Sequence, residues 1–200
     1  MKSTVILMLI SLLMAIQESL AQSESINDYR NFPIVLSLQF HSLAMPFKDF
    51  RSNFKNVGIG IGTEVSLNGS HDWVQQFDFV WIKNKGIGNA FHISSQAAWR
   101  PMIGADVFTE VKLGLGYILA KHPSPALIQK DGQWTSKGKK GKGMLTVPVG
   151  LGMGYYRYSE DWFVSPFLGY QLLLVSNYNQ TLPIVPQTLI QTGLRIHPTY

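Results

Sequence analysis

The sequence contains no cysteine, and this absence removes several classes of protein from consideration. Without a thiol there is no disulfide framework, no thiolate metal site, no cysteine nucleophile and no lipid anchor on an N-terminal cysteine. Charged residues are also scarce, at 14% of the chain, against roughly 25% in a typical soluble domain. With 46% hydrophobic and 12% aromatic residues, the composition is typical of a lipid-facing or tightly packed β protein rather than a disordered chain.

The formal net charge of +5 is small and dispersed, and no nucleic-acid-binding module accompanies it, so we expect no nucleic-acid partner. The histidines outside the strand 91–100 show no metal-ligand spacing. The sequence therefore predicts neither a metal nor another cofactor.

The N-terminus reads as an export signal. Lys2 gives a positive start, residues 4–16 form an apolar run broken only by Ser11, and the small residues Ser19 and Ala21 occupy the −3 and −1 positions of a cleavage site. The run is shorter than the ~20 residues of a spanning helix, which disfavours the alternative of an uncleaved anchor. We expect a signal peptide at 1–21, an N-terminal periplasmic segment at 22–32 and a β-barrel at 33–200.

Apolar and polar residues alternate through most of the remaining chain, which is the period of a strand with two unlike faces. The pattern is clearest at 57–66, 105–119 and 145–155, and weaker versions fill 34–41, 73–81, 91–100, 164–174 and 190–196. The gaps between these eight segments alternate between long and short, with an intermediate third gap at 83–89, as in barrels with short periplasmic turns and longer outer loops. Pro148 fits poorly inside a strand, and we expect a bulge to accommodate it.

Alternation alone leaves open a soluble barrel with its apolar face inside. The polar face, however, is rich in glycine, which suits the narrow lumen of an eight-stranded barrel, and the apolar face is too bulky to fill that lumen. Aromatic residues lie at the strand ends, as at the two membrane interfaces. The sequence therefore predicts an all-β, eight-stranded antiparallel up-and-down transmembrane β-barrel in the outer membrane. The aromatic residues are Trp73, Trp99, Tyr155 and Trp162 at one end and Trp81, Phe91 and Tyr117 at the other.

Glycine-alternating stretches at 57–64, 84–95, 111–117 and 150–155 resemble the small outer-membrane β-barrel proteins of Bacteroidota-type bacteria, which are OmpA/OmpX-like eight-stranded barrels. The resemblance covers nearly the whole exported chain. It implies a fold, an outer-membrane location beside lipid and lipopolysaccharide, and the barrel-assembly machinery as a partner during biogenesis. Because such strands recur in many barrels, it implies almost nothing about function.

Eight charged or titratable residues share the predicted inner face. Buried charges must pair, since an isolated charge is costly to desolvate. We expect a salt-bridge network that plugs the lumen, with a polar channel as the alternative, and Glu110 and Lys112 as neighbours on one face. The predicted lumenal network is Glu64, Asp78, His92, Arg100, Asp106, Glu110, Lys112 and Arg195.

His92 and Ser94 resemble the His-x-Ser arrangement of lipid A deacylase barrels, in which histidine is the base and serine the nucleophile. Such a pair needs a carboxylate to orient the imidazole, and Glu110 on the next strand is the one obvious candidate. Both residues lie on the predicted lumenal face, away from lipid, so we expect no catalysis. A narrow solute pore and this lipid A-modifying hydrolase remain the two alternatives to a structural or surface-interaction role.

A cationic segment follows Trp134 in the longest predicted loop. It is a candidate for binding anionic lipopolysaccharide or an acidic partner, and its alternative is a solvated hairpin tip. Its lysines are Lys137, Lys139, Lys140 and Lys142.

Overall fold

The computed structural model describes residues 32–42, 54, 56–68, 70–83, 88–104, 106–121, 127–130, 133–136, 141–159, 161–177 and 184–199. The predicted signal peptide (1–21) and nearly all of the predicted segment 22–32 lie outside these residues. No helix in the described ranges is long and apolar enough to cross a membrane.

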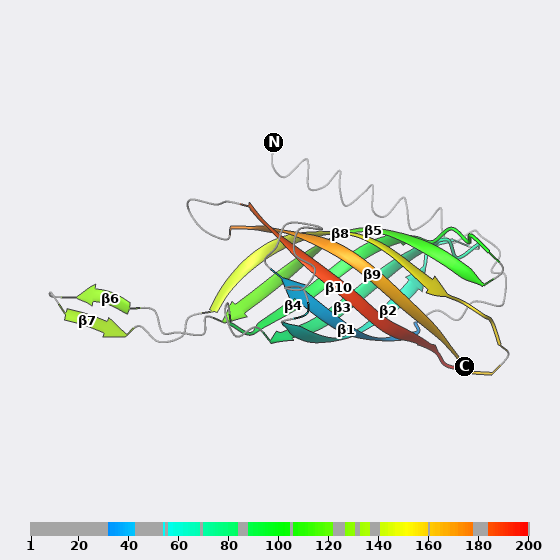
Figure 1. Ribbon diagram of the computed structural model, residues 1–200, viewed down its shortest axis with the longest axis horizontal. Coiled ribbons are helices and arrows are strands. Elements are labelled where there is room, and N and C mark those ends of the chain that lie inside the picture. Colours follow the sequence, from blue (N-terminus) through cyan, green and yellow to red (C-terminus); the bar gives the residue numbers. More distant parts are fainter. Residues whose placement is uncertain are drawn as a thin grey trace, which may run out of the picture.

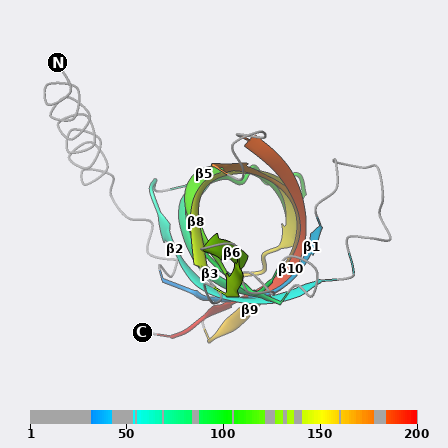
Figure 2. The same cartoon turned by 90° about the vertical axis from the view of Figure 1, so that its left-hand side faces the viewer.

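Eight strands close into one barrel in the order β1-β10-β9-β8-β5-β4-β3-β2, and every neighbouring pair is antiparallel. Figure 1 shows the strands winding obliquely round the long axis, and Figure 2 shows the closed ring end-on. The predicted eight-stranded antiparallel up-and-down barrel is confirmed. Its strands are β1 (Ile34–Ser42), β2 (Val57–Ser66), β3 (Trp73–Lys83), β4 (Ala90–Trp99), β5 (Val107–Lys121), β8 (Gly141–Tyr155), β9 (Phe163–Ser176) and β10 (Ile184–His197).

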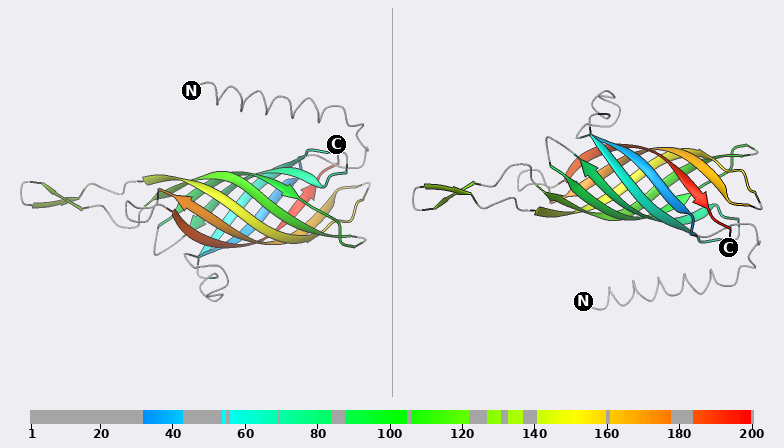
Figure 3. Two further views of the ribbon diagram at one scale, coloured as in Figure 1. Left: turned by 90° about the horizontal axis from the view of Figure 1, so that it is seen from above. Right: turned by 90° about the horizontal axis from the view of Figure 1, so that it is seen from below.

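A separate two-stranded sheet is inserted between β5 and β8. Its strands are β6 (Leu127–Lys130) and β7 (Gln133–Ser136), which pair antiparallel. Figure 3 shows this hairpin standing beyond one end of the barrel in both views.

The two faces of the strands lie as the alternation predicts. Outward residues are apolar and exposed, with Ile59 at 62%, Leu115 at 71% and Leu145 at 65%. Inward residues include charged side chains that are fully buried, among them Glu64 at 0% and Lys112 at 0%. The structure therefore has its polar face inside and its apolar face outside, which is the reverse of a soluble barrel.

The two ends of the barrel differ in their connections. At the end where β1 begins and β10 finishes, the strands are joined by residues 67–72, 100–106 and 156–162; we refer to it as the short-turn end. The opposite, long-loop end carries 43–56, 84–89, 122–140 and 177–183. The predicted alternation of lengths is thus only partly correct, because 84–89 and 177–183 are no longer than the turns opposite. β10 begins at Ile184, so residues 184–189, which precede the predicted strand 190–196, also belong to this strand.

The expected bulge at Pro148 is absent. Pairing of β5 with β8 keeps one register on both sides of the proline, from Leu113↔Val149 to Gly116↔Thr146, and the two pairs in between are missing. Pairing with β9 continues through Pro148↔Leu173. Proline has no N–H to donate, so the β5–β8 ladder lapses locally, while the flanking pairs hold the register and no extra residue is needed.

The barrel interior is filled in layers. Charged residues lie toward the short-turn end, and glutamines occupy the middle, where Gln171 Nε2 donates to Gln96 Oε1 at 3.2 Å and Gln191 Oε1 at 3.4 Å. The long-loop half contains an apolar cluster, a feature that the sequence interpretation missed, beside buried polar side chains such as His41 and Gln187, which are hydrogen-bonded at 2.6 Å. The buried members of the apolar cluster are Val80, Ile82, Ala90, Ile118, Met144, Leu173, Val175 and Leu189.

Candidate functional site in the barrel interior

Arg100, directly after β4, lies at the centre of the charged layer. Its guanidinium donates to both carboxylate oxygens of Glu64 on β2, from Nη1 to Oε2 at 2.7 Å and from Nη2 to Oε1 at 2.6 Å. Its Nε donates to Glu110 Oε2 on β5. The planar guanidinium thus holds two carboxylates at once, one of them in the bidentate geometry that arginine favours.

Two further cations complete the layer. Arg195 on β10 donates from Nε to Glu64 Oε1 and from Nη2 to Glu110 Oε2, each at 2.8 Å. Lys112 Nζ lies 2.8 Å from Glu110 Oε1. Three cations therefore share two carboxylates, and no side chain among the five is more than 8% exposed. We call Glu64, Arg100, Glu110, Lys112 and Arg195 the ion-pair layer.

A phenylalanine packs against this layer, and a glycine lets a neighbouring strand come close to it. Gly152 pairs with Glu110 across β5 and β8, and a Cβ there would stand 3.0 Å from the Leu168 carbonyl oxygen on β9, so glycine allows the close approach of that strand. The guanidinium of Arg195 lies over the Phe167 ring, with Cζ 4.1 Å from the ring centroid. Such cation–π contacts compensate part of the desolvation of a buried cation.

The other predicted network residues lie apart from the layer. Asp78 accepts hydrogen bonds from Gln76 at 3.0 Å and Gln96 at 3.3 Å, and His92 Nε2 contacts Thr146 Oγ1 at 3.1 Å. Asp106 is half-buried at the short-turn end, where it accepts a hydrogen bond from the Tyr155 hydroxyl at 3.1 Å. The structure therefore brings five of the eight predicted residues together and leaves Asp78, His92 and Asp106 outside the layer.

The geometry does not assemble the catalytic arrangement considered for His92 and Ser94. Ser94 Oγ accepts from Gln96 Nε2 at 3.3 Å, and both residues are buried inside the barrel. His92 pairs with Ile118 on β5, eight residues from Glu110, which corresponds to about 26 Å along a strand at ~3.3 Å per residue. Glu110 is therefore too far away to orient the imidazole.

The predicted surface site is only partly described. Trp134 belongs to β7, and Lys142 is exposed at the start of β8. Lys137, Lys139 and Lys140 lie outside the described residues. Among the residues that the structure does describe, no group of three histidines, aspartates or glutamates is placed to hold a metal ion.

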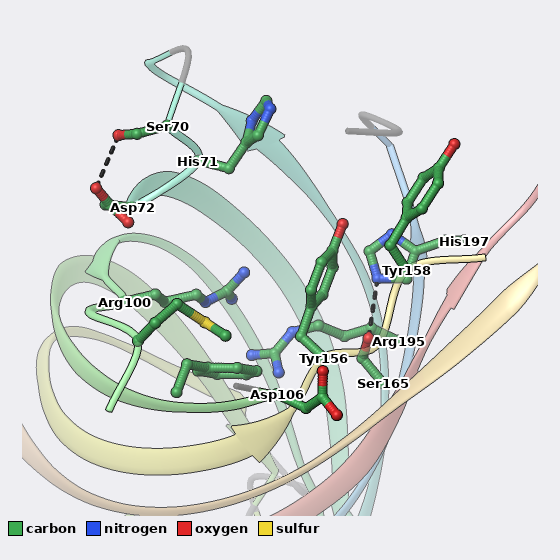
Figure 4. Close-up of a pocket in the computed structure, with 12 residues that line it drawn as sticks. Ser70, His71, Asp72, Arg100, Asp106, Tyr156, Tyr158, Ser165, Arg195 and His197 are labelled. Carbon is green, nitrogen blue, oxygen red and sulfur yellow. Dashed lines mark hydrogen bonds between the residues drawn. The ribbon is translucent and has the colours of Figure 1, made fainter. Parts of the chain in front are cut away.

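A pocket of about 360 Å³ opens at the short-turn end and was not predicted from the sequence. Arg100 and Arg195 of the ion-pair layer contribute to its lining, together with residues from the short turns and strand ends (Figure 4). Tyr156 and Tyr158, directly after β8, were the available signal, because paired aromatics in a short turn are candidates to cover the barrel mouth. The remaining lining residues are Ser70, His71, Asp72, Met102, Asp106, Phe108, Ser165 and His197.

Comparison with known proteins identifies the type of fold. No protein-family profile matches the chain, and a search of curated proteins finds no match. Among solved structures, Neisserial surface protein A (NspA) has a TM-score of 0.59 at 15% identity, over 83% of this chain and 96% of that one. The N-terminal β-barrel domain of Pseudomonas aeruginosa OprF has a TM-score of 0.48 at 14% identity, over 84% and 98% of the two chains. Ail, the attachment invasion locus protein of Yersinia pestis, has a TM-score of 0.48 at 15% identity, over 86% and 99% of the two chains.

The fold is that of small outer-membrane β-barrels, as the match to NspA shows. At such low identity the likeness concerns the fold alone. The resemblance to Bacteroidota-type proteins stays a prediction.

Proposed function

We propose that this chain is an outer-membrane barrel protein with a structural or surface-interaction role, and that its lumen is sealed. One observation carries the proposal: an apolar exterior surrounds a closed, ion-paired interior. Leu113, Leu151 and Leu168 are 59%, 63% and 51% exposed on the outer surface. In water, so large an exposed apolar surface would drive association, whereas in a bilayer it contacts lipid and a closed barrel leaves no unpaired edge.

The aromatic residues at the barrel ends support a membrane-spanning orientation. Trp73 and Trp99 are paired across β3 and β4, with ring centroids 6.4 Å apart, at the short-turn end. Trp81 and Phe91 pair on the same two strands toward the opposite end. Amphipathic rings at both ends of an apolar band are typical of the two membrane interfaces.

The filled interior favours a sealed barrel over the narrow-pore alternative. An ion that crossed the lumen would have to separate the carboxylates of Glu64 and Glu110 from Arg100 and Arg195, and breaking buried ion pairs is costly. It would then meet the buried apolar cluster of the long-loop half. We therefore expect no steady conductance through this barrel.

The surface role is assigned to the long-loop end. The β6–β7 hairpin stands beyond that end, and the exposed Lys142 is the second residue of the barrel strand β8. The lysines at 137–142 would attract the phosphates of lipopolysaccharide. We also expect the barrel-assembly machinery to be the partner during insertion, as the class of fold requires a catalysed route into the membrane.

The test of the proposed function combines location with conductance. The protein is expressed in a host with two membranes, the membranes are fractionated, and mobility on a gel is compared with and without boiling. We expect an outer-membrane protein with heat-modifiable mobility and no discrete current steps in planar bilayers. A soluble periplasmic protein would refute the membrane assignment, and regular current steps would refute the sealed lumen.

A further inference from the structure

The pocket at the short-turn end has an uneven charge distribution from floor to rim. Its floor meets the ion-pair layer, where three cations face two carboxylates. Figure 4 shows the guanidinium groups of Arg100 and Arg195 reaching toward each other from opposite sides of the pocket. Asp72 and Asp106 belong to the lining on the turns that form the rim. The pocket is therefore positive at its inner end and negative at its outer end.

Arg195 has hydrogen-bonding capacity left over at the floor. Its Nε and Nη2 donate to the two glutamates of the layer, whereas Nη1 is buried and has no hydrogen-bond acceptor among the described residues. A buried donor on a charged group is costly to leave unpaired. Nη1 is thus the unpaired donor of Arg195, and it can bind a ligand carboxylate when the guanidinium turns toward the pocket that it lines.

The rim carries two aspartate side chains, each with a hydrogen-bond donor. The carboxylate of Asp72 accepts a hydrogen bond from the Ser70 hydroxyl at 2.7 Å, and Asp106 accepts one from Tyr155. Partial burial lowers the pKa of the neighbouring His71, an effect that outweighs the opposing influence of Asp72, so this imidazole adds no positive charge at pH 7. A simple anion would therefore meet repulsion at the entrance, and a cationic group would be attracted there.

The walls between floor and rim are apolar and aromatic. The ring of Phe108 is buried, Met102 and Tyr158 belong to the same lining, and Tyr156 packs edge-on against Phe163 and His197 with ring centroids 5.3 and 5.7 Å away. With a volume of about 360 Å³, the pocket is at the small end of the range for ligand sites. It is suited to one small molecule with an apolar side group.

From these features we infer that the pocket binds a small zwitterion of the α-amino-acid class with an apolar or aromatic side chain. The ligand's carboxylate accepts from Arg195 Nη1 at the floor, its ammonium group faces Asp72 and Asp106 at the rim, and its side chain lies against Phe108, Met102 and Tyr156. This site goes beyond the proposed function. It can be tested in detergent micelles, where the result does not depend on where the barrel resides.

The test is a titration of the ¹⁵N-labelled protein in micelles, followed by NMR, with phenylalanine as the probe. Two analogues serve as matched ligands: phenylalanine amide lacks the carboxylate, and N-acetylphenylalanine lacks the ammonium group. We expect saturable shifts of the amide signals of Asp72, Met102 and Tyr156 with phenylalanine, and at least tenfold weaker binding of each analogue, because charge-assisted hydrogen bonds are the strong ones.

Protein variants separate the two ends of the pocket. Replacing both rim aspartates (Asp72→Asn with Asp106→Asn) removes the preference for phenylalanine over its N-acetyl analogue, whereas the exposed Asp161→Asn, outside the lining, leaves it unchanged. Arg195→Lys keeps the charge but loses Nη1, and weakens both carboxylate ligands at least tenfold; if this variant does not fold, the rim variants still decide the case. Equal binding of all three ligands, or no saturable shift up to about 10 mM, tenfold above a 1 mM Kd, would overturn the inference.

Discussion

The ion-pair layer predicts a large loss of stability when Glu110 loses its charge. Glu110→Gln keeps the size of the side chain and removes its charge, which leaves Arg100, Lys112 and Arg195 with the single carboxylate of Glu64. All three cations lie within 2.8 Å of a Glu110 oxygen in the structure. Because breaking a buried pair from one side leaves an uncompensated buried charge, the loss amounts to about 3–5 kcal/mol of the free energy of unfolding.

The assay is reversible urea unfolding of the refolded protein in lipid vesicles, followed by tryptophan fluorescence. Lys83→Gln is the control, because it removes an exposed charge outside the layer and changes the unfolding free energy by no more than about 0.5 kcal/mol. A second substitution, Lys112→Met, removes one cation from the Glu110→Gln variant, and it recovers about 1 kcal/mol or more if the two residues are coupled. A Glu110→Gln protein within about 1 kcal/mol of the wild type would show that the layer does not stabilise the fold as described.

Three further predictions follow from particular residues. Gly114→Ala places a Cβ against the Ser95 carbonyl oxygen and 2.7 Å from Gln96 Cα, and it lowers the unfolding free energy by about 1–3 kcal/mol. Gly104→Ala is the control and is neutral, because a Cβ there has nothing within 4 Å. Equal losses of stability in the two variants would contradict the predicted close approach at Gly114. Leu115→Arg, at the centre of the outer surface, costs about 2–4 kcal/mol in vesicles, against about 0–1 for Ile103→Arg at the short-turn end; similar costs at both positions would refute the depth assignment. Ser94→Ala leaves the number of acyl chains on lipid A unchanged in mass spectra, and a change in that number would support the alternative of a lipid A-modifying hydrolase.

The sequence was sufficient for the barrel because each strand carries its own two-faced pattern. The glycines of β2, at 58, 60 and 62, alternate with Val57, Ile59 and Ile61, and this local signal identifies both the strand and its inner face. Alternation weakens where the inner face is apolar as well, as in the run 172–175 of β9. The apolar cluster in the interior was missed for that reason, since such runs do not show which side chains point inward.

The partners within the ion-pair layer depend on the registers of strands far apart in the chain. Glu64 on β2 meets Arg195 on β10, although neither strand pairs with the other. A shared inner face was predictable for both, but their common level in the lumen follows only from the ladders of the closed barrel. Asp106 was misplaced for a related reason: β5 begins at Val107 rather than Ala105, so the aspartate falls in the turn and lines the pocket mouth.

The most direct test of the central claim is to measure which isoleucine methyl groups contact lipid. Ile59, Ile61 and Ile93 are 62%, 55% and 52% exposed on the outer surface, whereas Ile82 and Ile118 are 2% and 3% exposed inside the barrel. In nanodiscs, with only the isoleucine δ1 methyl groups labelled, the account predicts nuclear Overhauser cross-peaks between lipid acyl chains and the first three residues, and none to Ile82 or Ile118. Lipid cross-peaks to Ile82 and Ile118, with Ile59 and Ile61 protected, would mean that the faces are assigned the wrong way round.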